Sequence, residues 1–172
     1  MKKQIATGIL FCLVCVLTAC GYQFTGSGKF PAGVSRIFIT MLENRSSEPG
    51  IESTFTGDLI YEFTRNRKSA IADDRESADA VLSGTLSRIT TDTISRSSIS
   101  TALERRATAT LNLRLISLDG QVIWSSGDIV EDETYLVVQD NKAATNENKR
   151  KALLQISKKM AESAFSRMTD DF

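Results

Sequence analysis

The segment from residue 107 to residue 115 alternates strictly between apolar and polar side chains. The apolar positions are Ala107, Ala109, Leu111, Leu113 and Leu115, and the polar positions between them are Thr108, Thr110, Asn112 and Arg114. A period of two residues is that of a β-strand, whose successive side chains point to opposite faces of a sheet. Such a strand buries one face against another layer while the other face stays polar. The alternation therefore predicts a layered fold that contains a half-buried sheet.

A hairpin signal follows this strand. Asp119-Gly120 is a dipeptide typical of the two-residue turns that join antiparallel strands. Residues 121–130 then return as the partner strand, and the acidic residues 131–133 are expected to interrupt it before a short apolar stretch at 135–138. The alternating segment and its partner are thus predicted to be neighbours in one sheet.

A further strand is predicted upstream. Residues 80–89 alternate with period two, so Leu86 and Arg88 are expected on one face and Ile89 on the other. The β character continues, with fewer apolar residues, through the Ser/Thr-rich segment 90–101. The sheet therefore gains a long strand ahead of the hairpin.

Two segments have the spacing of amphipathic helices. Apolar residues recur with helical period through residues 51–63 and again through 153–168. The second helix is expected to open at the basic residues 149–151, after the polar segment 139–148. Residues 34–42 form a β-branched and aromatic run typical of a buried strand. The predicted order is β-α-β-β-β-α, an α/β (α+β) two-layer sandwich with a four-stranded mixed sheet and both helices on one face.

The chain begins with the features of a secretion signal. Lys2 and Lys3 precede an apolar run at residues 5–17. This run has the length of a signal-peptide core and is shorter than the roughly 20 helical residues that cross a bilayer. We therefore expect residues 1–19 to be a signal peptide that is removed from the mature protein.

The end of this leader resembles the bacterial lipobox. Residues 17–20 read Leu-Thr-Ala-Cys, and in lipobox proteins the cysteine receives a diacylglyceryl group and becomes the new, acylated N-terminus. By this resemblance Cys20 is the lipidation site, and Gly21 in place of aspartate favours sorting to the outer membrane. The alternative is an ordinary secretory leader with an incidental cysteine. Cys12 and Cys15 would leave with the leader, so the mature chain would hold no free thiol.

The mature chain divides into a tether and one domain. Residues 20–33 hold four of the ten glycines and one of the two prolines, which is typical of an irregular connecting segment. Residues 34–172 contain every predicted helix and strand, and a segment of that length is long enough for one self-sufficient core.

Charge balance and missing residue types exclude several classes of function. The 172 residues include 21 basic and 21 acidic side chains and no histidine. Zero net charge gives no electrostatic basis for binding nucleic acid. Without histidine the chain lacks the usual general base and the commonest metal ligand, and it has no Gly-x-Ser-x-Gly motif or phosphate-binding loop. We expect no enzyme activity, cofactor or metal, which disfavours a periplasmic hydrolase.

Four short strings along the chain carry a family resemblance. They are Cys20-Gly-Tyr-Gln-Phe, then Glu48-Pro49-Gly50-Ile51-Glu52, then Ala78-Asp79-Ala80-Val81-Leu82-Ser83-Gly84, and finally Val122-Ile123-Trp124. In this order they resemble the lipopolysaccharide-assembly lipoproteins of the LptE family, whose second strand carries an Ala-Asp-x-x-Leu-x-Gly string. The resemblance implies a lipid-anchored protein on the periplasmic leaflet of the outer membrane. There it would plug and support an LptD-type β-barrel and help insert lipopolysaccharide (LPS) into the outer leaflet.

The resemblance also suggests site residues. Candidates for contact with the polar lumen of the barrel are Thr108, Thr110 and Asn112, although this polar strand face would equally suit plain solvent. LPS phosphates favour arginine, and the candidates are Arg88, Arg96, Arg105 and Arg106. The alternative for the last two is a solvated strand start beside Glu104. A lipoprotein of another secretion or surface-assembly system, binding periplasmic protein partners, is the alternative function.

Overall fold

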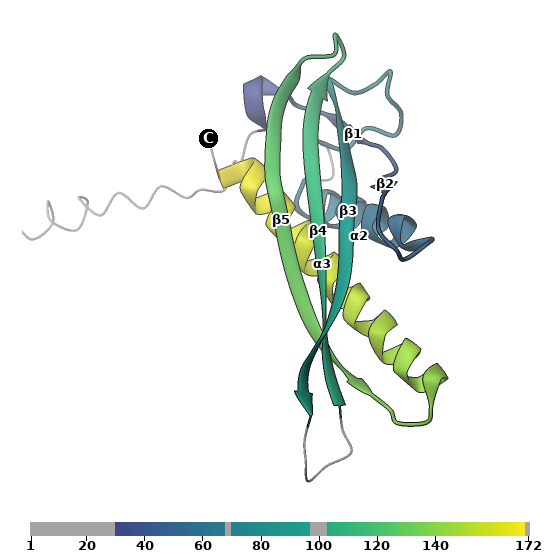
Figure 1. The fold of residues 1–172 in the computed structure, drawn as a ribbon. Helices are drawn as coiled ribbons and strands as arrows, with labels where there is room; N and C mark the ends of the chain where they lie inside the picture. The colour runs from purple at the N-terminus through teal and green to yellow at the C-terminus, as the bar shows by residue number, and fades with distance from the viewer. Residues whose placement is uncertain (1–29, 68–69, 97–102, 171–172) are drawn as a thin grey trace, which may run out of the picture.

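The computed structural model describes residues 30–67, 70–96 and 103–170 of the chain. The expected signal peptide, Cys20 and residues 20–29 of the expected tether lie outside the described residues. In chain order the elements are η1 (Pro31–Gly33), β1 (Ile37–Ile39), β2 (Glu43–Asn44), α2 (Ile51–Arg67), β3 (Ala80–Arg96), β4 (Leu103–Ser117), β5 (Val122–Val137) and α3 (Lys142–Asp170). Both long helices lie behind one face of a twisted sheet in Figure 1. This confirms the predicted two-layer α+β arrangement.

The sheet is mixed, as predicted. Its strand order is β1-β3-β4-β5, and the two-residue β2 also pairs with β3. β1 and β2 are parallel to β3, whereas β3, β4 and β5 pair antiparallel. Residues 34–42 do not form one strand, because Leu42 turns into the core and its N–H donates to Thr56 Oγ1 of α2 at 3.1 Å. None of the helices in the described residues is long and apolar enough to cross a bilayer.

The core lies between the sheet and the helices. All five apolar residues of the alternating segment in β4 are fully buried there. Gly84 of β3 faces this layer where no side chain fits, because a Cβ atom at Gly84 would collide with Leu113. The same atom would lie 2.8 Å from the backbone oxygen of Asn112 and 2.9 Å from Leu42 Cδ2. The glycine is therefore required by close packing.

The N-terminal end of the described chain is docked into this core. Phe30, which precedes η1, is 2% exposed and stacks on Phe63 with ring centroids 6.2 Å apart. The guanidinium of Arg67 lies 5.0 Å from the Phe30 ring centroid, and Phe63 meets Phe165 of α3 edge to face at 5.2 Å. The 3-10 helix η1 contacts β5 and lies at the end of the sheet where β4 turns into β5 (Figure 1).

A register shift after Leu86 changes the face of residues 88–93, up to a second shift between Thr93 and Ser95. The pairing of β3 with β4 shifts between Leu86 and Arg88, and Ser87 is the extra residue, with its hydroxyl donating to the Thr110 carbonyl at 3.1 Å. Beyond this bulge Ile89 is buried on the same face as Leu86, and Arg88 is exposed. The prediction that Leu86 and Arg88 share a face was wrong, because a bulge inserts one residue into the alternation.

The acidic residues 131–133 do not interrupt β5, contrary to the prediction. Glu131 accepts a hydrogen bond from the Ser163 hydroxyl at 2.9 Å, and Glu133 pairs with Lys159 at 2.7 Å. The hydrogen bond from Lys159 lowers the pKa of Glu133, and the same bond raises the pKa of Lys159. Because partners in α3 satisfy these carboxylates, the strand passes through them and reaches Val137.

The last helix starts earlier than predicted. α3 begins at Lys142, and the side chain of Asn141 accepts the N–H of Ala144 at 2.9 Å as an N-terminal cap. Residues 149–151 therefore lie well inside the helix. The first turns carry no apolar stripe, and polar contacts hold them in place instead. For example, the Thr145 hydroxyl accepts the N–H of Val138 at 3.0 Å.

Candidate functional site

The side of the sheet away from the helices, which we call the open face, is built from polar cross-strand rows. Register places these side chains side by side on β3, β4 and β5. From one end to the other the rows are Ser83–Arg114–Ser125, Thr85–Asn112–Asp128, Arg88–Thr110–Val130, Thr90–Thr108–Asp132 and Asp92–Arg106–Thr134. The three predicted barrel-contact residues occupy the middle rows on β4, and each is half-buried among its neighbours. The sheet thus gathers them into one continuous polar surface.

Two ordered contacts fix side chains on this face. Asn112 Nδ2 donates to Asp128 Oδ1 at 3.3 Å, and Arg106 Nε lies 3.2 Å from Asp132 Oδ2. Both pairs are exposed at the surface, so each contributes little to stability by itself. Arg88 is exposed in the middle row and has no ion-pair partner among the described residues. It therefore offers a free guanidinium at the centre of the open face.

The predicted basic candidates do not form one cluster. Arg88 and Arg106 lie on the open face. Arg105 lies on the opposite, helix-covered face, between its cross-strand neighbours Thr93 and Tyr135, and its Nε is buried without a hydrogen-bond partner. Arg96 ends β3 opposite Leu103, and its side chain lies outside the described residues. Because successive residues of a strand point to opposite faces, the adjacent Arg105 and Arg106 lie on different sides of the sheet.

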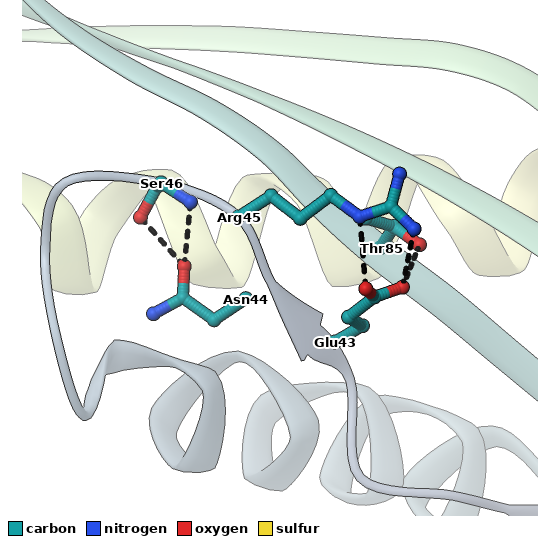
Figure 2. Close-up of polar contacts among 5 residues, drawn as sticks. All are labelled: Glu43, Asn44, Arg45, Ser46 and Thr85. Carbon is teal, nitrogen blue, oxygen red and sulfur yellow. Dashed lines mark hydrogen bonds and ion pairs between the residues drawn. The ribbon is translucent and has the colours of Figure 1, made fainter.

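A groove of about 570 Å³ opens on one end of this face, beside β2. Its lining includes Glu43, Arg45, Thr85, Asn112 and Arg114. Figure 2 shows the wall that β2 provides, where Arg45 binds both oxygens of Glu43 at 2.8 and 3.0 Å. The Thr85 hydroxyl donates to Glu43 Oε2 at 3.3 Å, and the hydrogen bond from Arg45 lowers the pKa of Glu43. Sequence reasoning missed this wall because only the pairing of β2 with β3 brings Glu43 to Thr85.

The family-like string at residues 48–52 is held in place by hydrogen bonds from Asn44, which precedes it. Asn44 accepts the N–H and the hydroxyl of Ser46 at 2.9 and 2.7 Å, as Figure 2 shows. Its amide nitrogen donates to the carbonyl of Glu48 at 2.8 Å and to the carboxylate of Glu52 at 2.7 Å. Lys149 of α3 then pairs with Glu48. The string at residues 48–52 therefore holds the entry of α2 against α3.

The string at residues 78–84 has a similar role. Asp79 Oδ2 accepts the N–H groups of Ser35 and Arg36, each at 2.9 Å, which ties the chain before β1 to the start of β3. Both bonds lower the pKa of Asp79, and the bond from the Arg36 N–H has the larger effect. Leu82 is buried in the core, and Gly84 occupies the close approach described above. Each fixed position of the string thus has a packing or hydrogen-bonding reason.

The open face suits recognition of another polar surface. Hydroxyls, amides and charged groups stand on rigid neighbouring strands, a pattern that can donate and accept many hydrogen bonds at once. No three Asp, Glu, Cys or His side chains of the described residues group closely enough to hold a metal ion. The chemistry on this face is therefore that of binding through hydrogen bonds and ion pairs.

Comparison with known families and structures gives a consistent result. The family model described as LptE, lipopolysaccharide-assembly, matches residues 34–168. The fold is similar to the solution structure of uncharacterized lipoprotein B from Nitrosomonas europaea, with 13% identity, a TM-score of 0.56, and coverage of 84% of this chain and 86% of that one. The fold is also similar to the crystal structure of a minor lipoprotein from Acinetobacter baumannii. The identity is 12%, the TM-score is 0.52, and the match covers 80% of this chain and 93% of that one. At such identities these structures show the fold alone, and no curated protein sequence matches the chain.

Proposed function

Because the chain belongs to the LptE lipopolysaccharide-assembly family, we propose that it is an outer-membrane lipoprotein that works in the LPS translocon. The observation that carries this proposal is the family match over residues 34–168, which spans nearly the whole domain. The family is one of non-enzymatic lipoproteins, so the role is binding and support. The protein would plug and support an LptD-type β-barrel and help place LPS in the outer leaflet.

The anchor of this proposal is Cys20. Its position at the end of a lipobox-like string supports acylation. Two or more acyl chains give stable membrane attachment, because each buried CH₂ contributes about 0.8 kcal/mol and one chain holds only marginally. Mass spectrometry of the exported protein tests this step. We expect an N-terminal peptide that starts at residue 20 and carries diacylglyceryl and acyl groups, and an unmodified N-terminus would contradict it.

The barrel contact is proposed for the open face. A barrel wide enough to need a plug has a polar, hydrated inner wall. The rows through Thr108, Thr110 and Asn112 supply matching hydroxyl and amide groups on rigid strands. Because these side chains stand away from the core, they are free to exchange bonds with solvent for bonds with the barrel wall.

Site-specific crosslinking tests the barrel contact in the acylated, full-length protein. A photoreactive residue at position 108 or 110 is expected to crosslink to a co-expressed LptD-type barrel. Lys158, exposed on the outer side of α3, is the matched position in the helix layer, and stronger crosslinking from β4 than from Lys158 would assign the open face. If intact protein co-purifies with no barrel at all, the translocon role fails. Capture of periplasmic proteins instead would favour a different assembly system.

LPS contact is proposed for the arginine candidates, of which Arg88 has the best support. It is exposed on the open face and has no ion-pair partner in the part of the chain that the structure describes, whereas Arg106 is paired with Asp132. A free guanidinium can bind phosphate through two parallel hydrogen bonds. We expect R88A to weaken LPS binding, measured with purified protein and LPS, and R150A on α3 to leave it unchanged. Equal binding by both variants would remove Arg88 from the ligand site, while Arg96, Arg105 and Arg106 would remain to be tested.

A further inference from the structure

The outer edge of β5 is covered by side chains of α3. Arg167 Nη1 donates to the backbone carbonyls of Ser126 and Asp128, both at 3.0 Å. Asn148 Nδ2 donates to the carbonyl of Leu136 at 2.9 Å, and Lys159 Nζ lies 3.4 Å from the carbonyl of Asp132. The Thr145 hydroxyl accepts the N–H of Val138. Side chains spread along α3 thus contact this edge at intervals from Ser126 to Val138.

The spacing of these contacts identifies the groups they cover. In an antiparallel pair, alternate residues direct their N–H and C=O toward the neighbouring strand, and the residues between direct theirs outward. Asp128, Asp132 and Leu136 are separated by four positions and therefore point their backbone groups the same way. β5 has β4 as its neighbour on one side only. The carbonyls bound by α3 are therefore the outward-facing groups that would otherwise accept another strand.

An uncovered edge of this kind would be a hazard. A long edge strand with free backbone groups readily pairs with another chain. β5 also carries exposed apolar side chains, with Val130 at 55% and Leu136 at 50% exposure. Both residues share the parity of Asp132, so they flank the same outward-facing backbone groups. Without its cover, β5 would offer hydrogen-bonding groups and apolar side chains together.

By contrast, the outer edge of β3 beyond the bulge has no such cover among the described residues. The last backbone bond onto that edge is from the N–H of Arg45 to the carbonyl of Leu86. Within residues 30–67, 70–96 and 103–170, no further bond from β2 or a helix side chain reaches the backbone between Ile89 and Thr93. The cover on β5 is therefore a specific feature of α3 and not a general property of the sheet edges.

We propose that α3 acts as an edge guard that keeps β5 from adding the β5 strand of a second copy of this chain. The sequence of β5 suits this partner. In an antiparallel pairing centred on Thr134, Val130 lies opposite Val138 of the second copy, and Asp132 lies opposite Leu136. Between residues 130 and 138 no acidic side chain then lies directly opposite another, so directly opposed like charges do not prevent the pairing there. This inference goes beyond the translocon role and does not depend on it.

The test compares two double variants of the acylated, full-length protein in detergent. N148A/R167M removes the two guard side chains with the shortest carbonyl bonds. N146A/K158M is the matched control, because it also replaces one asparagine by alanine and one cation by methionine, at exposed α3 positions for which the structure shows no bond to β5. Sedimentation velocity at increasing protein concentration is expected to show monomers for the parent and the control. The guard variant is expected to dimerise at least about tenfold more tightly.

Two further variants make the result decisive. T134C in the guard variant is expected to form a disulfide-linked dimer, whereas T134C in the otherwise unchanged protein is not. R167K, which keeps a donor near the same carbonyls, is expected to remain monomeric. If N148A/R167M keeps its circular-dichroism spectrum and stays as monomeric as the control, the guard role is wrong. If that double variant loses its fold, the single variant N148A, which removes one exposed bond, decides the question by the same measurement.

Discussion

The two faces of β4 differ in burial and polarity although their residues alternate along one strand. On the helix-covered face every side chain from Ala107 to Leu115 is fully buried, whereas on the open face Thr108, Thr110 and Asn112 stay half-buried and polar. Burial of apolar surface stabilises the domain by about 25 cal/mol per Å², and the open face gives up that gain. The covered face therefore stabilises the fold, and the open face remains available for the barrel contact that we propose.

The largest effect is expected from a cavity on the covered face. L111A removes a fully buried side chain, and we expect it to lower the free energy of unfolding by about 2–5 kcal/mol. Urea denaturation followed by circular dichroism measures the change. A loss below about 1 kcal/mol would mean that the helix layer relaxes onto the sheet and that the two faces differ little in their contribution to stability.

The next effect concerns the one position of β3 where the core admits no side chain. G84A adds a methyl group that collides with Leu113 and approaches the backbone oxygen of Asn112. Because backbone must move, we expect a destabilisation of about 1–3 kcal/mol. The matched control is G57A in α2, where an added Cβ meets no atom within 4 Å, and it should stabilise the helix by about 1 kcal/mol. Equal behaviour of the two variants in thermal melts would contradict the packing argument.

An acid-dependent effect is expected at the start of β3. The pKa of Asp79 is lowered in the folded protein because its carboxylate accepts two backbone N–H groups. This stabilisation is present above the ordinary carboxyl pKa, near 3.9 in an unfolded chain, and is lost as the pH falls through the folded pKa. D79N should therefore lower the melting temperature at pH 7, and the difference from the parent should shrink toward pH 3. D73N, a change in an exposed loop carboxylate, is the control, and a pH-independent difference for D79N would refute the role of the charge.

The smallest effect on stability is expected on the open face. T110A changes a half-buried hydroxyl away from the core, and we expect the free energy of unfolding to stay within about 0.5 kcal/mol of the parent. If the proposed barrel contact is right, the bulky variant T110R should also fold but co-purify less with an LptD-type barrel. A large loss of stability in T110A would mean that the open face contributes to the fold.

The elements whose signals are local could be predicted from sequence. The alternation through 107–115 and the helical spacing at 51–63 gave the right faces, since each depends only on its own period. The polar face that forms the candidate site followed from the same alternation. Its position in the middle of three strands needed the register of the sheet, which the residues of β4 alone do not encode.

The errors arose where distant residues decide the local structure. Residues 131–133 read as an interruption because their partners Ser163 and Lys159 are about 30 positions away in sequence. The bulge at Ser87 moves the residues that follow it to the opposite face of β3. The groove wall forms only because β2 pairs with β3 beside Thr85. A missed bulge also changes the candidate site, because it is the reason why Arg88 lies on the open face.

The burial of Phe30 marks the point at which the N-terminal connecting segment joins the folded domain. If Cys20 carries the proposed lipids, residues 20–29 separate them from Phe30, and ten residues reach at most about 33–36 Å. The 17 residues of β3 extend over roughly 56 Å, which exceeds the maximum length of this connecting segment. The η1 end of the domain would therefore stay within that distance of the bilayer, whereas the opposite end of the sheet could lie farther from the membrane than the connecting segment can reach.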